Sequence, residues 1–162
     1  MQRAKRIVVL GTGYAGLTLA TRLDKRVKDN EIILVDANEH HELIQQAHLV
    51  AAGIKKAEDT RFSISKIIEN TNIKFFNSFA KMVNADEKKV ILDNGHLAYD
   101  LLVVALGAKT RTFGIEGATK YGFVLRSIDD ALKIKNTEIN RVFIVDFLKP
   151  TGLPQLHLFS LS

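Results

Sequence analysis

Three glycines near the start of the chain have the spacing of a phosphate-binding turn. Residues 11–16 (GTGYAG) directly follow the apolar run Arg6–Leu10, which predicts a buried β-strand. Gly11 would allow a tight turn, Gly13 would let phosphates approach the backbone, and Gly16 would let a following helix pack close to the strand. The amino end of that helix would direct N–H groups and a partial positive charge at an anion. This layout is typical of a site for the diphosphate of a dinucleotide.

One acidic residue supplies the second part of the predicted site. The run Glu31–Val35 predicts another buried strand, and Asp36 follows it, about 20 residues after Gly16. At that spacing a carboxylate can accept hydrogen bonds from ribose hydroxyls. Its charge would repel a 2′-phosphate, so FAD or NAD is expected rather than NADP. The alternative is an ordinary β-α-β unit with a glycine turn and a solvated aspartate.

Hydrophobic patterning predicts the helices that position these motifs. A helix is expected from Tyr14 to Val27, with a buried stripe made of Ala15, Leu19, Leu23 and Val27. With its two flanking strands it would form a right-handed crossover, the usual hand for parallel strands. Residues 37–53 are expected to form a loop and a short helix ending at Gly53, and residues 63–69 a further helix.

Later segments predict the rest of a sheet. Further strands are expected at residues 73–77, 79–84, 88–93 and 97–99. The last three have the turn residues of a small antiparallel meander, including Asn94-Gly95. The apolar run at 99–106 predicts a central parallel strand covered on both faces, and Gly107 ends it where ligands bind in open α/β sheets. We therefore expect an α/β fold: a Rossmann-like FAD/NAD(P)-binding domain whose parallel sheet carries an inserted β-meander.

Composition excludes several kinds of chemistry. The 162 residues are 46% hydrophobic and 25% charged, which suits one globular domain, and no apolar run is long enough to span a membrane. The chain has no cysteine, which excludes disulfides, thiolate metal ligands and a cysteine nucleophile within it. The formal net charge is +5, but basic and acidic residues are interleaved. Without an aromatic platform or a basic helix, nucleic acid is not an expected partner.

Three of the five histidines lie close together in the sequence. His40 and His41 are adjacent, and His48 is well separated from both. This spacing does not place two of them one helical turn apart at i and i+4, as a metal pair on a helix would require. No metal site is expected, and these histidines are interpreted as surface or loop-packing residues.

Together these segments resemble the FAD-binding half of flavoproteins with two dinucleotide domains. The resemblance covers residues 5 to about 145 and is greatest to the type II NADH dehydrogenases and the related sulfide:quinone oxidoreductases. Two stretches favour this branch. Residues 41–53 are similar to its flavin-proximal loop and helix, and residues 113–118 with 126–134 are similar to its connection toward the NADH domain.

The resemblance implies a role for each cofactor-binding residue. The glycines of the turn would cradle the FAD diphosphate with help from the backbone between them, and Asp36 would bind the adenosine ribose. The backbone of Ala80 would contact the adenine, and residues 106–107 would lie under the flavin. The implied set is Gly11, Gly13, Tyr14, Ala15, Gly16, Asp36, Ala80, Leu106 and Gly107. No catalytic side chain is assigned, because the isoalloxazine supplies the chemistry.

The sequence departs from the family in three places. Leu106 stands where many relatives carry threonine, and Gln45-Gln46 stands where relatives often carry a proline; neither excludes FAD. Residues 141–145 look like the first strand of a second dinucleotide-binding domain, but no glycine motif follows. We expect residues 1–140 to be the FAD-binding domain and 141–162 the start of a lost second domain with a divergent tail. A frameshift, an early stop or a fragmentary gene model would produce such an end.

By resemblance, the expected function is that of a FAD-dependent oxidoreductase passing electrons from NADH to a quinone. Relatives attach to the membrane through a C-terminal region absent here, so the expected location is the cytoplasm, at the inner face of the cell membrane. The chain is expected to be truncated and inactive toward NADH on its own. The alternatives are a sulfide:quinone oxidoreductase fragment, a non-catalytic nucleotide-binding module and an unfinished chain that binds nothing.

Overall fold

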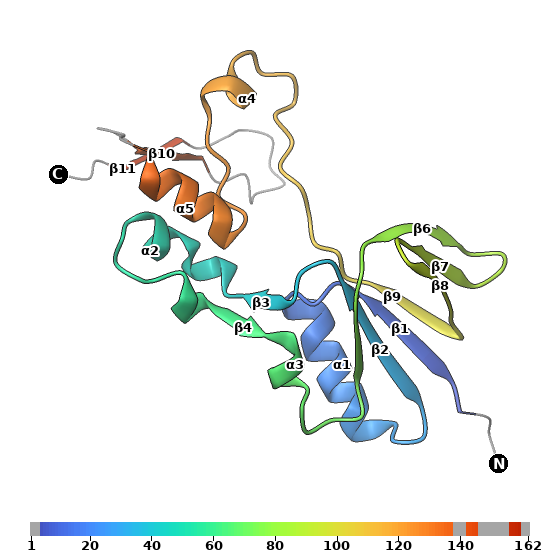
Figure 1. Cartoon of the computed structure of the whole chain (residues 1–162). Coiled ribbons are helices and arrows are strands. Elements are labelled where there is room, and N and C mark those ends of the chain that lie inside the picture. The colour runs from blue at the N-terminus through green and yellow to red at the C-terminus, as the bar shows by residue number, and fades with distance from the viewer. Residues whose placement is uncertain (1–3, 138–141, 146–155, 160–162) are drawn as a thin grey trace. The chain divides into compact units, whose positions relative to one another are not determined.

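The apolar runs of the sequence form a parallel sheet. The computed structural model describes residues 4–137, 142–145 and 156–159. Within them, β1 (Arg6–Leu10) pairs in parallel with β2 (Glu31–Asp36) and β9 (Leu101–Val104), and β2 pairs in parallel with β5 (Lys74–Asn77). The strand order is β5-β2-β1-β9 (Figure 1). The predicted α/β fold with a parallel sheet is therefore confirmed.

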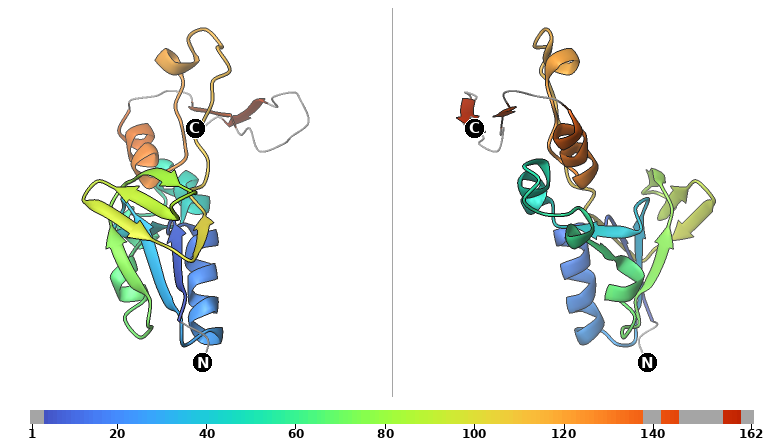
Figure 2. Two further views of the ribbon diagram at one scale, coloured as in Figure 1. Left: turned by 90° about the vertical axis from the view of Figure 1, so that its right-hand side faces the viewer. Right: turned by 60° about the vertical axis from the view of Figure 1, so that its left-hand side comes forward.

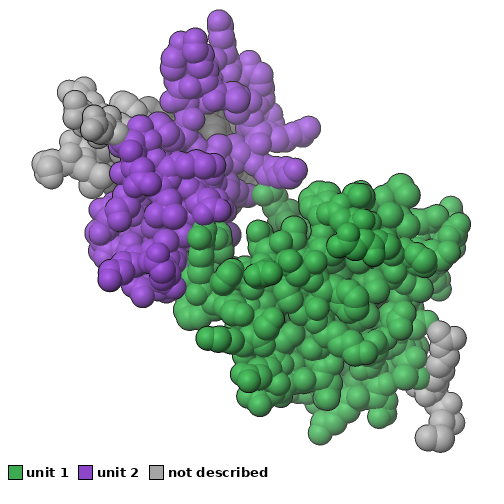
Figure 3. All heavy atoms as spheres, viewed as in Figure 1, with its two compact units in different colours: residues 1–42, 61–108 green, residues 43–60, 109–162 purple. Residues whose placement is uncertain are grey.

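The chain forms two compact units (Figure 3). Unit 1 comprises residues 1–42 and 61–108, and unit 2 comprises residues 43–60 and 109–162. The parallel sheet and every residue predicted to bind the cofactor belong to unit 1. The predicted domain boundary at residue 140 lies outside the described residues.

Helix α1 (Tyr14–Arg26) covers one face of the sheet. Val9 and Leu34 point toward it and pack with Leu17 and Ala20. Ala15, which was expected in the buried stripe, is exposed, so that part of the prediction is wrong. The helix instead buries Gly16, Leu17 and Ala20, because close contact at Gly16 sets which side of the helix faces the strands.

The antiparallel meander covers the other face of the sheet (Figure 2). It consists of β6 (Ala80–Asn84), β7 (Lys89–Leu92) and β8 (Gly95–Ala98), which confirms the prediction. Val90 and Leu92 pack against the alternate side chains of β1 and β2. Both faces of the two central strands are thus buried, which explains their continuous apolar sequences.

Strand β9 differs from its prediction. It lies at the edge of the sheet as described, not at its centre, and Leu101 and Val104 are 51% and 62% exposed. Its middle residues, Leu102 and Val103, pack on the meander side and the helix side respectively. The apolar run therefore reflects cover on both faces at mid-strand, and it carries no information about whether a further strand pairs alongside.

Two short strands join the carboxyl side of β2 to the rest of unit 1. Strand β3 (His40–Glu42) pairs antiparallel with β4 (Arg61–Ser63), where a loop was expected at residues 40–42. Helix α3 (Ile64–Ile67) follows, shorter than predicted. Glu42 and Arg61 form an ion pair across the two strands at 2.9 Å.

Unit 2 has a small core of its own. Helices α2 (Ala47–Ala51) and α5 (Ile128–Asn136) contribute Val50, Ile128 and Ala131 to it. The remaining elements are η1 (Ile44–Gln46), η2 (Glu58–Thr60), α4 (Ala118–Tyr121), β10 (Val142–Val145) and β11 (Leu156–Phe159). Strand β10 was predicted, whereas no regular structure was predicted where β11 pairs antiparallel with it.

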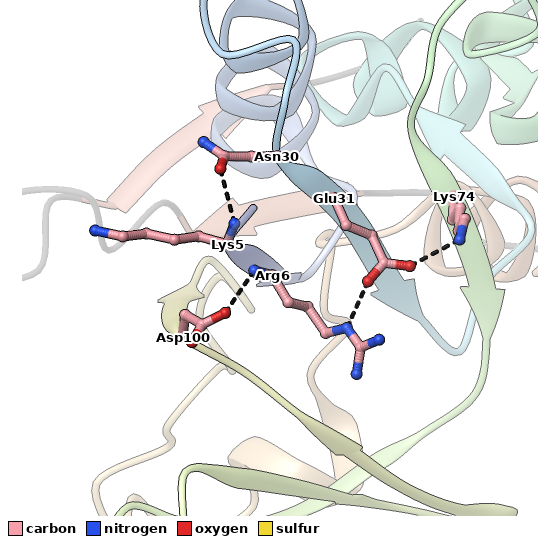
Figure 4. Close-up of polar contacts among 6 residues, drawn as sticks. All are labelled: Lys5, Arg6, Asn30, Glu31, Lys74 and Asp100. Atoms are coloured by element: carbon pink, nitrogen blue, oxygen red, sulfur yellow. Dashed lines mark hydrogen bonds and ion pairs between the residues drawn. The ribbon is translucent and has the colours of Figure 1, made fainter. Parts of the chain in front are cut away.

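Charged residues link the amino ends of the parallel strands (Figure 4). Glu31 accepts from Arg6 Nε at 2.6 Å and from Lys74 Nζ at 2.7 Å, which ties β1, β2 and β5 together. Asp100 accepts from the backbone N of Arg6 at 2.7 Å. The hydrogen bonds from Lys74 and Arg6 hold the pKa of Glu31 below its usual value of 4.5. These contacts stabilise the strand register at the end of the sheet opposite the glycine turn.

Candidate functional site

The turn after β1 has a backbone conformation that requires glycine at Gly11. Its φ is +98°, a value that L side chains rarely adopt, and its N–H donates to Val35 O at 2.8 Å. A Cβ at Gly11 would overlap the carbonyl group of Ala105, the residue that follows β9. The turn is therefore pressed between the carboxyl ends of β2 and β9.

The other two glycines of the motif have opposite surroundings. A Cβ at Gly16 would overlap the carbonyl oxygen of Gly11, so α1 meets the turn more closely than any other residue would permit. A Cβ at Gly13 would find no atom of the described residues within 4 Å, its own helix and chain neighbours aside. Gly13 thus opens onto free space at the amino end of α1, where a phosphate can approach the backbone.

No acidic residue in the first turn of α1 offsets the partial positive charge at its amino end. Gly13 is the N-cap of this 13-residue helix, with no side-chain capping bond, and the first turn contains no acidic residue. Tyr14 and Ala15 are its first two residues, and both are exposed. The partial positive charge of the helix terminus is therefore available to an external anion.

The carboxylate of Asp36 lies against this turn. Its Oδ2 accepts from Thr12 N at 2.7 Å and from Thr12 Oγ1 at 2.8 Å, and its Oδ1 accepts from Asn38 N at 2.9 Å. A carboxylate offers about four lone-pair positions, so these three bonds leave Oδ1 with room for a ribose hydroxyl. Asp36 therefore has two roles open to it, supporting the turn and binding a sugar.

The segment that carries Ala80 is tied to the end of β2. Ser78 N donates to Asp36 O at 2.9 Å, and the Asn77 side chain donates to Asp36 O at 3.1 Å. Ala80 is the first residue of β6 and pairs with Leu92. The hydroxyl oxygen of Ser78 is buried and has no hydrogen-bond partner among the residues described. A polar atom of this kind beside Asp36 suits an adenosine-binding position.

Residues 106–107 lie beside the glycine turn. Ala105 N donates to Leu10 O at 2.8 Å, which extends the β1–β9 pairing by one residue. The Cα of Leu106 lies 3.2 Å from the position that a Cβ on Gly11 would take. Gly107 has a φ of +74°, and a Cβ built on it would meet no atom within 4 Å in the part of the chain that the structure describes. The segments predicted to bind the cofactor thus lie together at the carboxyl end of the parallel strands, within unit 1.

The sequence analysis did not assign a role to two residues at this end of the sheet. Thr12 is 2% exposed and His41 is 8% exposed. His41 Nδ1 lies 2.9 Å from Thr12 O, and its ring meets that of Tyr14 edge-on, with centroids 4.8 Å apart. The interpretation of His41 as a surface residue is wrong, because the side chain is buried, and it packs from strand β3 rather than from a loop. The sequence holds no signal for the contact, because its acceptor is a backbone carbonyl.

The match to a protein family accords with this geometry. The family of pyridine nucleotide-disulphide oxidoreductases matches residues 5–145, and the chain belongs to that family. This stretch contains the whole parallel sheet, the glycine turn and Asp36. The predicted oxidoreductase family and the predicted Rossmann-like fold are both confirmed.

The chain is also similar in sequence to relatives that are named for an enzymatic activity. The chain is 37% identical over 135 residues to the type II NADH:quinone oxidoreductase of Staphylococcus haemolyticus and 33% identical to that of Staphylococcus aureus. Each alignment covers 82% of this chain and 34% of the relative. The chain therefore spans about a third of the length of these relatives.

Solved structures show the same fold. The sulfide:quinone oxidoreductase of Aquifex aeolicus superimposes with a TM-score of 0.77 at 28% identity, covering 82% of this chain and 31% of that one. NDH2 of Plasmodium falciparum gives a TM-score of 0.73 at 26% identity, covering 82% of this chain and 28% of its own.

Proposed function

We propose that this chain binds FAD, with the diphosphate at the amino end of α1 and the adenosine ribose at Asp36. The observation that carries the proposal is the contrast between Gly13, which faces open space, and Gly11 and Gly16, which are pressed against backbone. A φ of −66° does not require glycine, so what the missing side chain provides at Gly13 is room for a ligand to approach the backbone.

The choice of ligand rests on charge and on the segments beside the turn. The carboxylate of Asp36 would repel the 2′-phosphate of NADP, which leaves FAD and NAD. The adenine would lie near Ala80, and the flavin near Leu106 and Gly107. The family resemblance supports FAD as the nucleotide held by this half of the protein.

The activity proposed for the protein at the length of its relatives is electron transfer from NADH to a quinone. When bound, the flavin supplies the two-electron chemistry. The residues of this chain bind and orient it, and we assign none of them a proton-transfer role. The relatives found by sequence, at 37% and 33% identity, are NADH:quinone oxidoreductases, so we favour NADH as the donor.

Membrane attachment remains part of the proposal. None of the helices described is long and apolar enough to cross a membrane. An association with the inner face of the cell membrane is expected from the kind of protein that the relatives represent, since a quinone is a membrane-borne acceptor.

The test is a titration of the 162-residue chain with FAD. We expect a structured flavin absorption spectrum, quenched flavin fluorescence and a higher melting temperature, because a ligand that binds only the folded state stabilises it. Gly13→Ala should abolish these effects and leave the fold intact. A wild-type chain that stays colourless and melts at the same temperature with FAD would reject the proposal. An equal response to ADP and FAD would favour a general nucleotide-binding module.

A further inference from the structure

Thr12 is held by several hydrogen bonds, although glycines flank it in the turn. Its side chain is buried, and it takes part in three hydrogen bonds to two distant segments. Asp36 accepts from its N–H and its hydroxyl, and its carbonyl oxygen lies 2.9 Å from His41 Nδ1. We propose that Thr12, Asp36 and His41 form a clamp that shapes the turn before the diphosphate arrives, with His41 as a positioning residue. This inference rests on the proposed function.

The contact places a hydrogen on Nδ1 of His41. A backbone carbonyl oxygen can only accept a hydrogen bond, so Nδ1 must carry the hydrogen and donate it to Thr12 O. The imidazole ring is buried at this position. It is 8% exposed on β3, opposite Phe62 of β4, and it packs edge-on against the Tyr14 ring.

Peptide geometry carries the effect of His41 to the neighbouring residue. The bond between Thr12 and Gly13 is trans and planar, so its C=O and N–H point in opposite directions. When His41 holds the Thr12 carbonyl, the N–H of Gly13 is turned to the other side. Gly13 is the N-cap of α1, so His41 would orient this N–H at the amino end of the helix without touching a ligand.

Such a clamp is needed because of the glycines on either side. Glycine has more backbone freedom than any other residue, and fixing it costs entropy. If the three hydrogen bonds of Thr12 fix the turn before a ligand binds, the backbone entropy is lost during folding and does not weaken ligand binding. Asp36 fixes one side of Thr12 through its N–H and hydroxyl, and His41 fixes the other side through the carbonyl.

Two substitutions at His41 separate this role from simple packing. In His41→Asn, the amide nitrogen takes the place of Nδ1 and can still donate to Thr12 O. In His41→Leu, a side chain of the same branching carries no donor. Both variants lose the ring contact with Tyr14. Only the leucine variant loses the hydrogen bond.

FAD affinity of the full 162-residue chain is measured by quenching of flavin fluorescence. We expect His41→Leu to bind FAD about tenfold more weakly than His41→Asn, the effect of one lost hydrogen bond. Equal affinities in the two variants would overturn the clamp. Failure of the wild-type chain to bind FAD would instead overturn the proposed function.

A second readout needs no ligand. With glycine labelled in ¹⁵N, the amide signal of Gly13 should shift in His41→Leu relative to His41→Asn, because only the leucine frees the Thr12 carbonyl. Loss of the ring is common to both variants and cancels in the comparison. Identical Gly13 signals in the two variants would overturn the clamp whether or not FAD binds.

Discussion

Thr12 and Asp36 are joined by two hydrogen bonds to a single oxygen. The backbone N and the hydroxyl of Thr12 lie 2.7 and 2.8 Å from Asp36 Oδ2. The end of β2 and the turn after β1 are therefore one polar unit, and the carboxylate that would bind a ribose also supports the diphosphate turn. Substitution of Asp36 should therefore affect the binding of both the ribose and the diphosphate of a dinucleotide.

Removal of the carboxylate at Asp36 should weaken FAD binding. Asp36→Ala loses the hydrogen bond to the ribose and the support of Thr12, and we expect a loss of about 1–3 kcal/mol in binding free energy. Flavin fluorescence titration measures it. Asp86→Ala is the matched control, because it removes the same charge from an exposed turn of the meander. If both variants bind FAD as the wild type does, the ribose assignment is wrong.

A methyl group at Gly16 should destabilise the fold. Gly16→Ala would press a Cβ against the carbonyl oxygen of Gly11, and relieving the overlap requires α1 or the turn to move. Overpacking of this kind costs about 1–3 kcal/mol in the free energy of unfolding, measured by denaturant titration. Gly13→Ala, with open space around it, should change stability by less than about 1 kcal/mol. Equal denaturation midpoints for the two variants would contradict the packing described for the turn.

The ion pairs of Glu31 predict a pH dependence of stability. Its pKa in the folded state is lowered, so the folded chain gains stability from Glu31 above the usual value of 4.5 and loses it as the pH falls toward the folded-state pKa. The contribution is about 1 kcal/mol or less, because Lys74 is largely exposed. Glu31→Gln should flatten the decline in unfolding free energy below pH 4.5. An unchanged pH profile in the variant would show that these ion pairs contribute nothing.

The exposed edge of β9 predicts self-association. Leu101 and Val104 present apolar side chains on an edge strand of the described sheet, and such edges promote pairing between chains. Leu101→Lys should lower light scattering at high protein concentration and leave the melting temperature nearly unchanged, since the side chain is half exposed. Scattering that is the same in the wild type and the variant would rule out this edge as the cause.

Local sequence was enough to predict the turn and the elements around it. The glycine spacing and the apolar strands before and after it depend on near neighbours, and they led to β1, α1 and β2 within one residue of their ends. The meander followed from its turn residues in the same way.

What could not be predicted depends on contacts between distant segments. The partner of His41 is a carbonyl oxygen 29 residues away, and any residue type would supply that oxygen. The glycine motif predicted the close packing of Gly16, but the stripe counted from Ala15 did not follow it, because α1 buries Leu17 and Ala20 beside Gly16. The edge position of β9 depends on which strands pair beside it, and its own composition is compatible with either place.

A crystal structure of the chain with FAD tests the central claim most directly. We predict the diphosphate against the backbone of Gly13 at the amino end of α1, with the adenosine ribose within hydrogen-bonding distance of Asp36 Oδ1. A nucleotide bound elsewhere on the chain, or a turn closed by protein atoms in the complex, would contradict the proposed site and the function built on it.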